Sequence, residues 1–174
     1  MILVDPDLDP APPSLALQTK RMSSADLPLT DRDRRLPSAR TLTRFLREAQ
    51  AAVRLRGEVS VLLTTDQTIR RLNRQFRHIN KATDVLSFPA PRVAAAEVAG
   101  DLAISVPTAL RNARTQGHAL AVEIKVLILH GLLHLAGFDH EVDNGRMARR
   151  ERLLRGRLGL PQGLIERAKT RVAL

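Results

Sequence analysis

Residues 119–136 form a helix-length run that is apolar on every side after Lys125 and contains two histidines, His130 and His134. A helix that is apolar all round must be buried inside a protein or a membrane. The run from Val126 to Phe138 falls short of the ~20 residues that a membrane-spanning helix needs, so burial inside the protein is expected. Gly137 follows, and glycine often ends a helix in the left-handed conformation. The sequence therefore predicts a buried central helix that ends near Gly137.

The histidines of this segment point to a metal. His130 and His134 are four residues apart, so they lie on one face of the helix, and a turn at Gly137 brings His140 back to the same point. Burying three clustered imidazoles that share no purpose is costly. Zn²⁺ prefers four tetrahedral ligands and is commonly bound by histidine. We therefore predict one Zn²⁺ per chain, with an open fourth position as in catalytic zinc sites.

Two neighbours of the histidines bear on the chemistry. In the helix motif of zinc metallopeptidases, a glutamate that serves as general base follows the first histidine. Gly131 stands at that position here, which weakens a peptidase assignment. Asp139 lies directly beside His140 in the sequence and is our candidate for orienting a ligand imidazole or handling protons. A plain role in the turn is the alternative for Asp139.

Composition limits the partners. The chain has 174 residues, most simply one domain, and a formal net charge of +10, which favours a polyanion such as nucleic acid. It has no cysteine, which excludes disulfides and thiolate ligands and is compatible with the cytoplasm, where we expect the protein. We predict no membrane partner. With four Phe and no Trp or Tyr, nucleic acid should be bound mainly through its phosphates.

The hydrophobic patterns predict an α+β fold in which a small mixed sheet packs against several helices around the buried metal-bearing helix. Expected strands are 2–4, 58–65, 84–88 and 101–105, and the other expected helices are 39–55, 66–77, 107–116 and 143–158. Ser38 and Asp66 are the expected caps of the first two of these helices. We predict a proline-rich arm over 1–40, a catalytic domain over 41–158 and a basic tail over 159–174.

The segment 69–81 has five basic residues and no acidic one. Its basic stripe consists of Arg70, Arg74, Arg77 and Lys81, at spacings of four, three and four residues. Ile69, Leu72 and Phe76 should occupy the opposite, apolar side. The basic stripe is either an ordinary solvated helix face or a phosphate-binding surface, since arginine binds phosphate oxygens in a bidentate manner. The many arginines of helix 143–158 should be mostly solvated.

Three motifs together resemble the YbeY family of bacterial metal-dependent endoribonucleases. They are residues 73–77 with the Lys-Ala-Thr-Asp-Val-Leu-Ser-Phe-Pro string at 81–89, the Gly-Asp strand at 100–105, and the H-G-x-L-H-x-x-G-x-D-H string at 130–140. The resemblance covers about residues 41–155, in the family's order. Ala82 stands where many members have proline, and the arm at 6–37 is longer than is usual in the family.

This resemblance implies cleavage of single-stranded RNA, linked to 16S ribosomal RNA 3′-end maturation and to ribosome quality control. The small ribosomal subunit and its assembly factors are the implied partners. The implied zinc ligands are His130, His134 and His140, with Arg77 in the active cleft. We expect Arg77 and Asp139 to be catalytic and four residues to bind substrate: Arg70, Arg74, Lys81 and Ser87. The alternatives are a zinc metallopeptidase-like hydrolase and a non-catalytic ribosome assembly factor with a structural metal.

Overall fold

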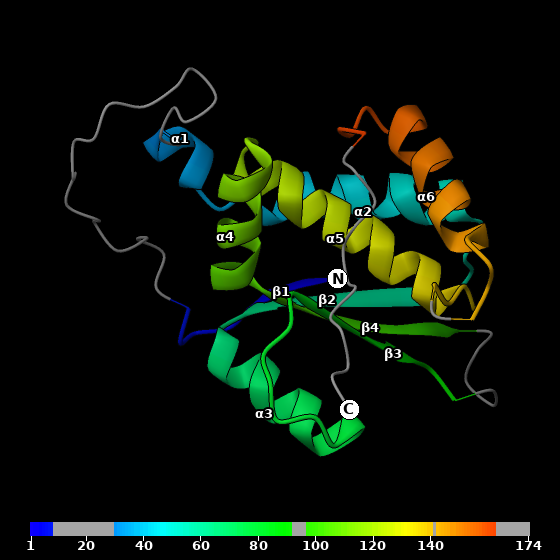
Figure 1. The fold of residues 1–174 in the computed structure, drawn as a ribbon, viewed down its shortest axis with the longest axis horizontal. Helices are drawn as coiled ribbons and strands as arrows, with labels where there is room; N and C mark the ends of the chain where they lie inside the picture. The colour runs from blue at the N-terminus through cyan, green and yellow to red at the C-terminus, as the bar shows by residue number, and fades with distance from the viewer. Residues whose placement is uncertain (9–29, 92–96, 141, 163–174) are drawn as a thin grey trace.

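The computed structural model describes residues 1–8, 30–91, 97–140 and 142–162. Four strands form one sheet in the order β1 (Ile2–Val4), β2 (Glu58–Thr64), β4 (Val98–Ser105) and β3 (Val85–Pro89) (Figure 1). The pairs β1–β2 and β2–β4 are parallel, and β3 pairs with β4 in the antiparallel sense. The small mixed sheet predicted from the sequence is confirmed, with β3 as an outer strand.

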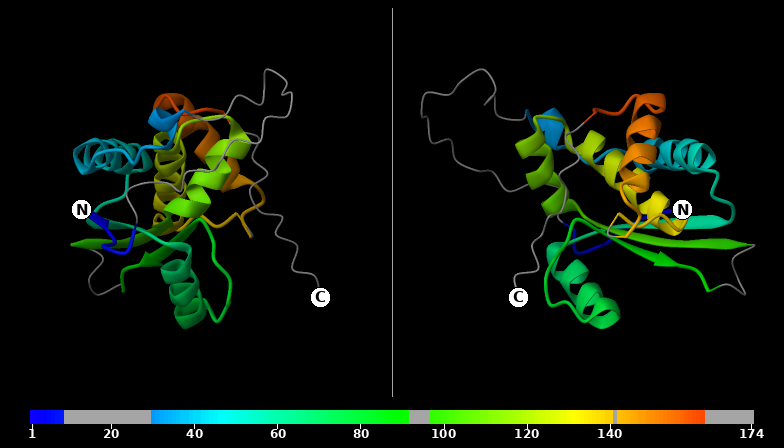
Figure 2. Two further views of the ribbon diagram at one scale, coloured as in Figure 1. Left: turned by 90° about the vertical axis from the view of Figure 1, so that its left-hand side faces the viewer. Right: turned by 45° about the vertical axis from the view of Figure 1, so that its right-hand side comes forward.

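Helices cover both faces of the sheet (Figures 1 and 2). On one face lie α2 (Ala39–Val53), α4 (Val106–Gln116), α5 (Leu120–Leu135) and α6 (Arg146–Arg157). On the other lies α3 (Asp66–Arg77), and a short helix, α1 (Asp31–Arg34), precedes α2. Because α5 contacts the sheet on one side and α2 and α6 on others, it is the buried central helix that its composition predicts.

The strands alternate their side chains between the two helical layers. On β4, Leu102 belongs to the main core with α5, whereas Ala103 belongs to a smaller cluster under α3 with Ile69 and Leu86. This two-residue period is the usual consequence of strand geometry. It places successive residues of β3 and β4 on the α5 side and the α3 side of the sheet.

The helix starts follow one prediction and correct another. Ser38 caps α2, since its hydroxyl accepts a hydrogen bond from the Thr41 backbone N–H at 3.3 Å. The cap of α3 is Thr65 and not Asp66, since the Thr65 hydroxyl accepts from the Thr68 N–H at 3.2 Å. The Asp66 carboxylate instead accepts hydrogen bonds from α4, including one from Arg111 at 2.8 Å.

Other boundaries also differ from the predictions, among them the start of α6, which is Arg146 and not the expected 143. The strand β4 begins at Val98, three residues before the expected 101, and α1 lies inside the predicted arm. Residues 9–29, 92–96 and 163–174 lie outside the described part, so most of the arm and the tail stay predictions, as do the three domain boundaries.

Among the described helices, none is long and apolar enough to cross a membrane alone, and the pair α4–α5 meets the length and composition test only together, with a bend of 110°.

Candidate metal centre

The end of α5 places the histidines. Gly137 has a φ of +87°, and its N–H donates to the carbonyl of His134 at 2.9 Å. The N–H of Phe138 donates to the carbonyl of Leu133 at 3.0 Å. These two bonds form the glycine-terminated Schellman motif. The predicted stop at Gly137 is therefore confirmed, and the chain that leaves it carries His140 back toward α5.

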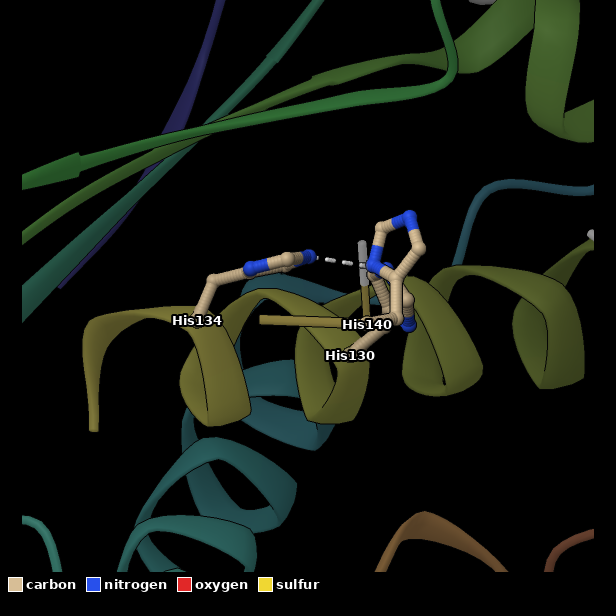
Figure 3. A group of neighbouring side chains, drawn as sticks. All are labelled: His130, His134 and His140. Carbon is tan, nitrogen blue, oxygen red and sulfur yellow. Dashed lines mark hydrogen bonds between the residues drawn. The ribbon is translucent and has the colours of Figure 1, made fainter. Parts of the chain in front are cut away.

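Three imidazoles meet at this point (Figure 3). One possible ligand atom from each of His130, His134 and His140 lies within 4.8 Å of the others. The Nε2 atoms of His130 and His134 are 3.2 Å apart. Two nitrogens bound at about 2.0–2.1 Å to one tetrahedral zinc lie roughly 3.3–3.4 Å apart, so this pair already has the required spacing. The three predicted ligands are brought together and could hold a metal ion.

The protonation of His134 suits metal binding. Burial of its ring, together with the nearby charges of His130 and His140, lowers the pKa of His134 to about 4. The ring is therefore neutral at pH 7, and only a neutral imidazole has the lone pair that a metal needs.

A buried carboxylate from α6 fixes the orientation of His130. Glu151 is 4 % exposed, and its Oε2 lies 3.0 Å from the Nδ1 of His130. Burial by itself raises the pKa of Glu151, but the hydrogen bond from His130 and the positive charge of Arg155 lower that pKa to about 2. Because an ionised carboxylate only accepts hydrogen bonds, Nδ1 carries the proton and Nε2 keeps its lone pair for the metal.

Arg155 completes this network. Its Nε donates to Oε1 of Glu151 at 2.9 Å, and its Nη2 forms a second bond to the same oxygen. Arg155 is buried, so the prediction that the arginines of this helix are mostly solvated is wrong at this position. Glu151 was not predicted from the sequence either. The available signal was that Glu151 is the single acidic residue of α6, four residues before Arg155.

Comparisons with known proteins agree with this geometry. The family model for "Endoribonuclease YbeY" matches residues 29–159. The endoribonuclease YbeY of Koribacter versatilis is 52 % identical over 130 residues, which cover 75 % of this chain and 84 % of the relative. That of Solibacter usitatus is 50 % identical over 129 residues, which cover 74 % and 85 %.

The chain belongs to the YbeY endoribonuclease family. A solution structure of a Thermotoga maritima protein is similar in fold, with a TM-score of 0.50 and 27 % identity, over 71 % of this chain and 85 % of that one. The family model begins at residue 29 and thus includes α1, twelve residues earlier than the resemblance read from motifs alone.

In this YbeY chain, Arg77 ends α3 and is exposed. Its positive charge contributes to the lowered pKa of His134, so the guanidinium acts on the histidine cluster even though α3 and α5 cover opposite faces of the sheet. Asp139 acts in the opposite sense, since its negative charge raises the pKa of His134. Both predicted catalytic residues thus lie within electrostatic reach of a metal ligand, and their roles stay predictions.

The residues predicted to bind substrate separate into two groups. Arg70, Arg74 and Lys81 are exposed, and Arg70 donates from Nε to the side chain of Asn80 at 2.9 Å. Ser87 is buried, and its hydroxyl donates to the carbonyl of Gly131 at 3.5 Å, a long bond between β3 and α5. The geometry gives Ser87 a contact with the metal-bearing helix, and its predicted contact with substrate is untested.

Gly131 allows α5 to approach the sheet. A Cβ at this position would lie 2.7 Å from Cδ2 of Leu102 and 3.3 Å from the hydroxyl of Ser87. A side chain at position 131 therefore points into the sheet. The glutamate that metallopeptidases place after the first histidine has no room here.

Proposed function

We propose that this chain is a zinc-dependent, single-strand-specific endoribonuclease that acts in 16S ribosomal RNA 3′-end maturation and in ribosome quality control. One observation carries the proposal: three histidines converge within 4.8 Å, in a family whose relatives are named endoribonucleases, with the charge of Arg77 reaching one of them. Nitrogen donors at tetrahedral spacing favour Zn²⁺ over the oxygen-seeking Mg²⁺ and Ca²⁺.

The residues of the site have different proposed roles. When bound, Zn²⁺ supplies a Lewis acid that polarises a phosphoryl oxygen. Glu151 holds the proton on Nδ1 of His130 and so fixes that ring as a ligand. Arg77 stabilises the negative charge that builds on the phosphate oxygens in the transition state. Asp139 accepts or returns the proton of the attacking or leaving oxygen.

RNA is the proposed partner at this site, together with the small ribosomal subunit and its assembly factors in the cytoplasm. The net charge of +10 supports a polyanionic partner. The basic stripe extends this charge along α3 away from Arg77. Phosphates of a strand whose scissile bond lies at the metal centre can therefore be bound by the same helix.

Two other functions are less well supported. A peptidase of the helix-motif type needs a general base at position 131. Gly131 has no side chain, and a Cβ there would lie 2.7 Å from Leu102, so a glutamate does not fit. A purely structural zinc site is closed by four protein ligands. Among the described residues, the histidine cluster holds three donors and no fourth His, Cys, Asp or Glu.

The test compares substrates on the same preparation. Purified protein is incubated with single-stranded RNA spanning a 16S 3′ end, the same sequence as a duplex, and casein, each with and without a chelator. We expect cleavage of the single strand only, lost with the chelator and in His134→Ala, and restored to the wild type by added Zn²⁺. Cleavage of casein, or of RNA at an equal rate in His134→Ala, would contradict the proposal.

A further inference from the structure

An aromatic side chain is displayed to solvent at the C-terminal end of α3. Phe76 is 56 % exposed, and Ile79 in the following loop is 51 % exposed. The hydrophobic pattern places Phe76 on the apolar side of this helix, and more than half of the residue's surface is nevertheless open to solvent. Its ring meets the ring of Phe88 on β3 edge to face, with the centroids 5.2 Å apart and the planes at 69°. Phe76 is thus exposed and at the same time held in place.

The loop beside Phe76 is fixed by side chains of the same helix. Asn73 is buried and donates from Nδ2 to the carbonyl of Lys81 at 2.8 Å. Arg70 bonds to Asn80 in the same loop. The N–H of Ile79 donates to the carbonyl of Asn73 at 3.3 Å. The surface around the ring is therefore built by specific contacts and does not depend on the binding of a partner.

The exposed ring is connected to the metal-bearing helix through β3. Phe76 directly precedes Arg77, the residue proposed to act on the phosphate. Phe88 follows Ser87, whose hydroxyl bonds to the residue after the ligand His130. Because β3 is an outer strand, an extended chain that crosses its edge passes from the α5 side, where the histidines lie, to the α3 side, where Phe76 lies.

The charges around the ring indicate what covers it. The basic stripe belongs to the same helix and loop as Phe76, and no acidic residue occurs between Gln67 and Thr83. An exposed aromatic ring on a segment whose charged residues are all cations matches a nucleotide, which has a flat base and an anionic phosphate. An apolar protein segment would leave these cations without counter-charges.

We propose that Phe76, supported by Phe88, stacks against one unpaired base of the RNA strand whose phosphate lies at the metal centre. The inference rests on the proposed ribonuclease function and adds a reason for single-strand specificity, because a base inside a duplex has both faces covered by its neighbours. It adds one stacking position to a surface that otherwise binds phosphates. Stacking tolerates any base, so no sequence preference is expected from it.

The test uses the metal-loaded protein and short single-stranded RNAs that carry one 2-aminopurine and phosphorothioate linkages to slow cleavage. Moving the 2-aminopurine along the strand should find one position whose fluorescence is quenched on binding. Phe76→Leu keeps an apolar side chain without a ring, and it should abolish this quenching and weaken binding about tenfold, the order expected for the loss of one stacked base. Phe76→Tyr should bind within about twofold of the wild type.

Two controls separate stacking from other effects. Leu153→Ala, at an equally exposed apolar residue on α6, should leave binding and quenching unchanged. An abasic nucleotide at the quenched position should weaken binding to the wild type and leave Phe76→Leu unaffected. Equal binding and quenching by the wild type and Phe76→Leu would overturn the stacking inference while leaving the ribonuclease function standing. A wild type that binds and cuts no RNA would instead overturn the proposed function.

Discussion

The positive charge of Arg77 acts on the histidine cluster, where it helps to lower the pKa of His134. If the guanidinium stabilises the phosphate in the transition state, Arg77→Ala should lower turnover of RNA by about 10²-fold or more. Zinc content and folding should stay intact, since the side chain is exposed. Arg77→Lys should restore little, because an ammonium lacks the bidentate fork. Steady-state kinetics with parallel metal analysis is the measurement.

The matched control for Arg77 is Arg71, which is exposed on the same helix and acts on Asp5 at the end of β1. Arg71→Ala should change turnover by less than twofold. As an ordinary surface substitution, it should also alter stability by no more than ~0.5 kcal/mol. Arg70 is a poorer control because it also holds Asn80. Small and equal effects at positions 71 and 77 would show that the basic stripe is only a solvated face.

The role of Glu151 should be measurable as a change in the affinity for zinc. Glu151→Gln keeps the shape of the side chain but removes the charge that holds the proton on Nδ1 of His130. Loss of such a partner typically weakens metal binding by about 10–100-fold. Competition with a chromophoric chelator gives the affinity. Glu48→Gln, an exposed substitution on α2, should leave it unchanged, and an unaltered zinc affinity in Glu151→Gln would show that the network has no role in metal binding.

The three histidines were predicted as metal ligands from the sequence, whereas the role of Glu151 was not. The three ligands were predictable because they lie within eleven consecutive residues, so the helix period and one glycine turn are enough to relate them. Glu151 is 21 residues from His130 and reaches it only because α6 packs on α5. No local pattern specifies that packing.

At the level of elements, the tight contact between α5 and the sheet depends on Gly131. Gly131→Ala would place its Cβ 2.7 Å from Cδ2 of Leu102, which is 1 % exposed and packed in the core. Overpacking of this kind costs typically about 1–3 kcal/mol, against a gain of up to ~1 kcal/mol from helix propensity. We expect a net loss of stability and a shift of His130 that weakens zinc binding.

Gly156→Ala is the control for Gly131→Ala, and we expect it not to destabilise the protein. Gly156 lies in α6, and a Cβ there would meet only the Gln162 side chain at 3.4 Å among its near neighbours. Gly156→Ala should therefore be neutral or stabilise by up to ~1 kcal/mol. Urea denaturation of both variants measures the difference. If Gly131→Ala is as stable as Gly156→Ala, the close packing of α5 on β4 is not a constraint on the fold.

The boundaries of elements with a strong hydrophobic period were predicted closely. Features that depend on tertiary contacts were not. The helix expected at 39–55 is found at Ala39–Val53, since Leu42, Phe45 and Ala49 all face the core. The start of β4 was missed because Gly100, with a φ of +143°, interrupts the strand pattern. The exposure of Phe76 was not predicted, because a helix period assigns a residue to a face but does not say what covers that face.

For the molecule as a whole, the excess of positive charge predicts how RNA binding responds to salt. Each phosphate neutralised by Lys or Arg releases counterions, so affinity for single strands should fall with a log–log slope of about −0.7 per contact. Between roughly 50 and 200 mM salt we expect a loss of at least tenfold if several arginines take part. Arg74→Ala should make the slope shallower. A flat salt response in the wild type would show that the basic stripe does not contact the phosphates.

The ionisable residues around the metal site should also make the stability of the metal-free protein depend on pH. The pKa of His134 falls from 6.5 to about 4 on folding, so the unfolded chain binds a proton that the folded chain does not, and stability should decrease as pH falls from 6.5 to 4. The pKa of Glu151 falls from 4.5 to about 2, so its contribution is complete above pH 4.5 and is lost as pH falls toward 2.

Chemical denaturation of chelator-treated protein between pH 7 and 3 tests both windows at once. The wild type should lose stability continuously below pH 6.5. Glu151→Gln should start less stable, because Arg155 and His130 lose their buried acceptor charge, and its curve should be flatter than the wild type only below pH 4.5. Saturating Zn²⁺ should raise stability most at pH 7 and progressively less as protons compete for the imidazoles. Parallel curves for the wild type and Glu151→Gln across the whole range would show that the buried network does not link α6 to the stability of the site.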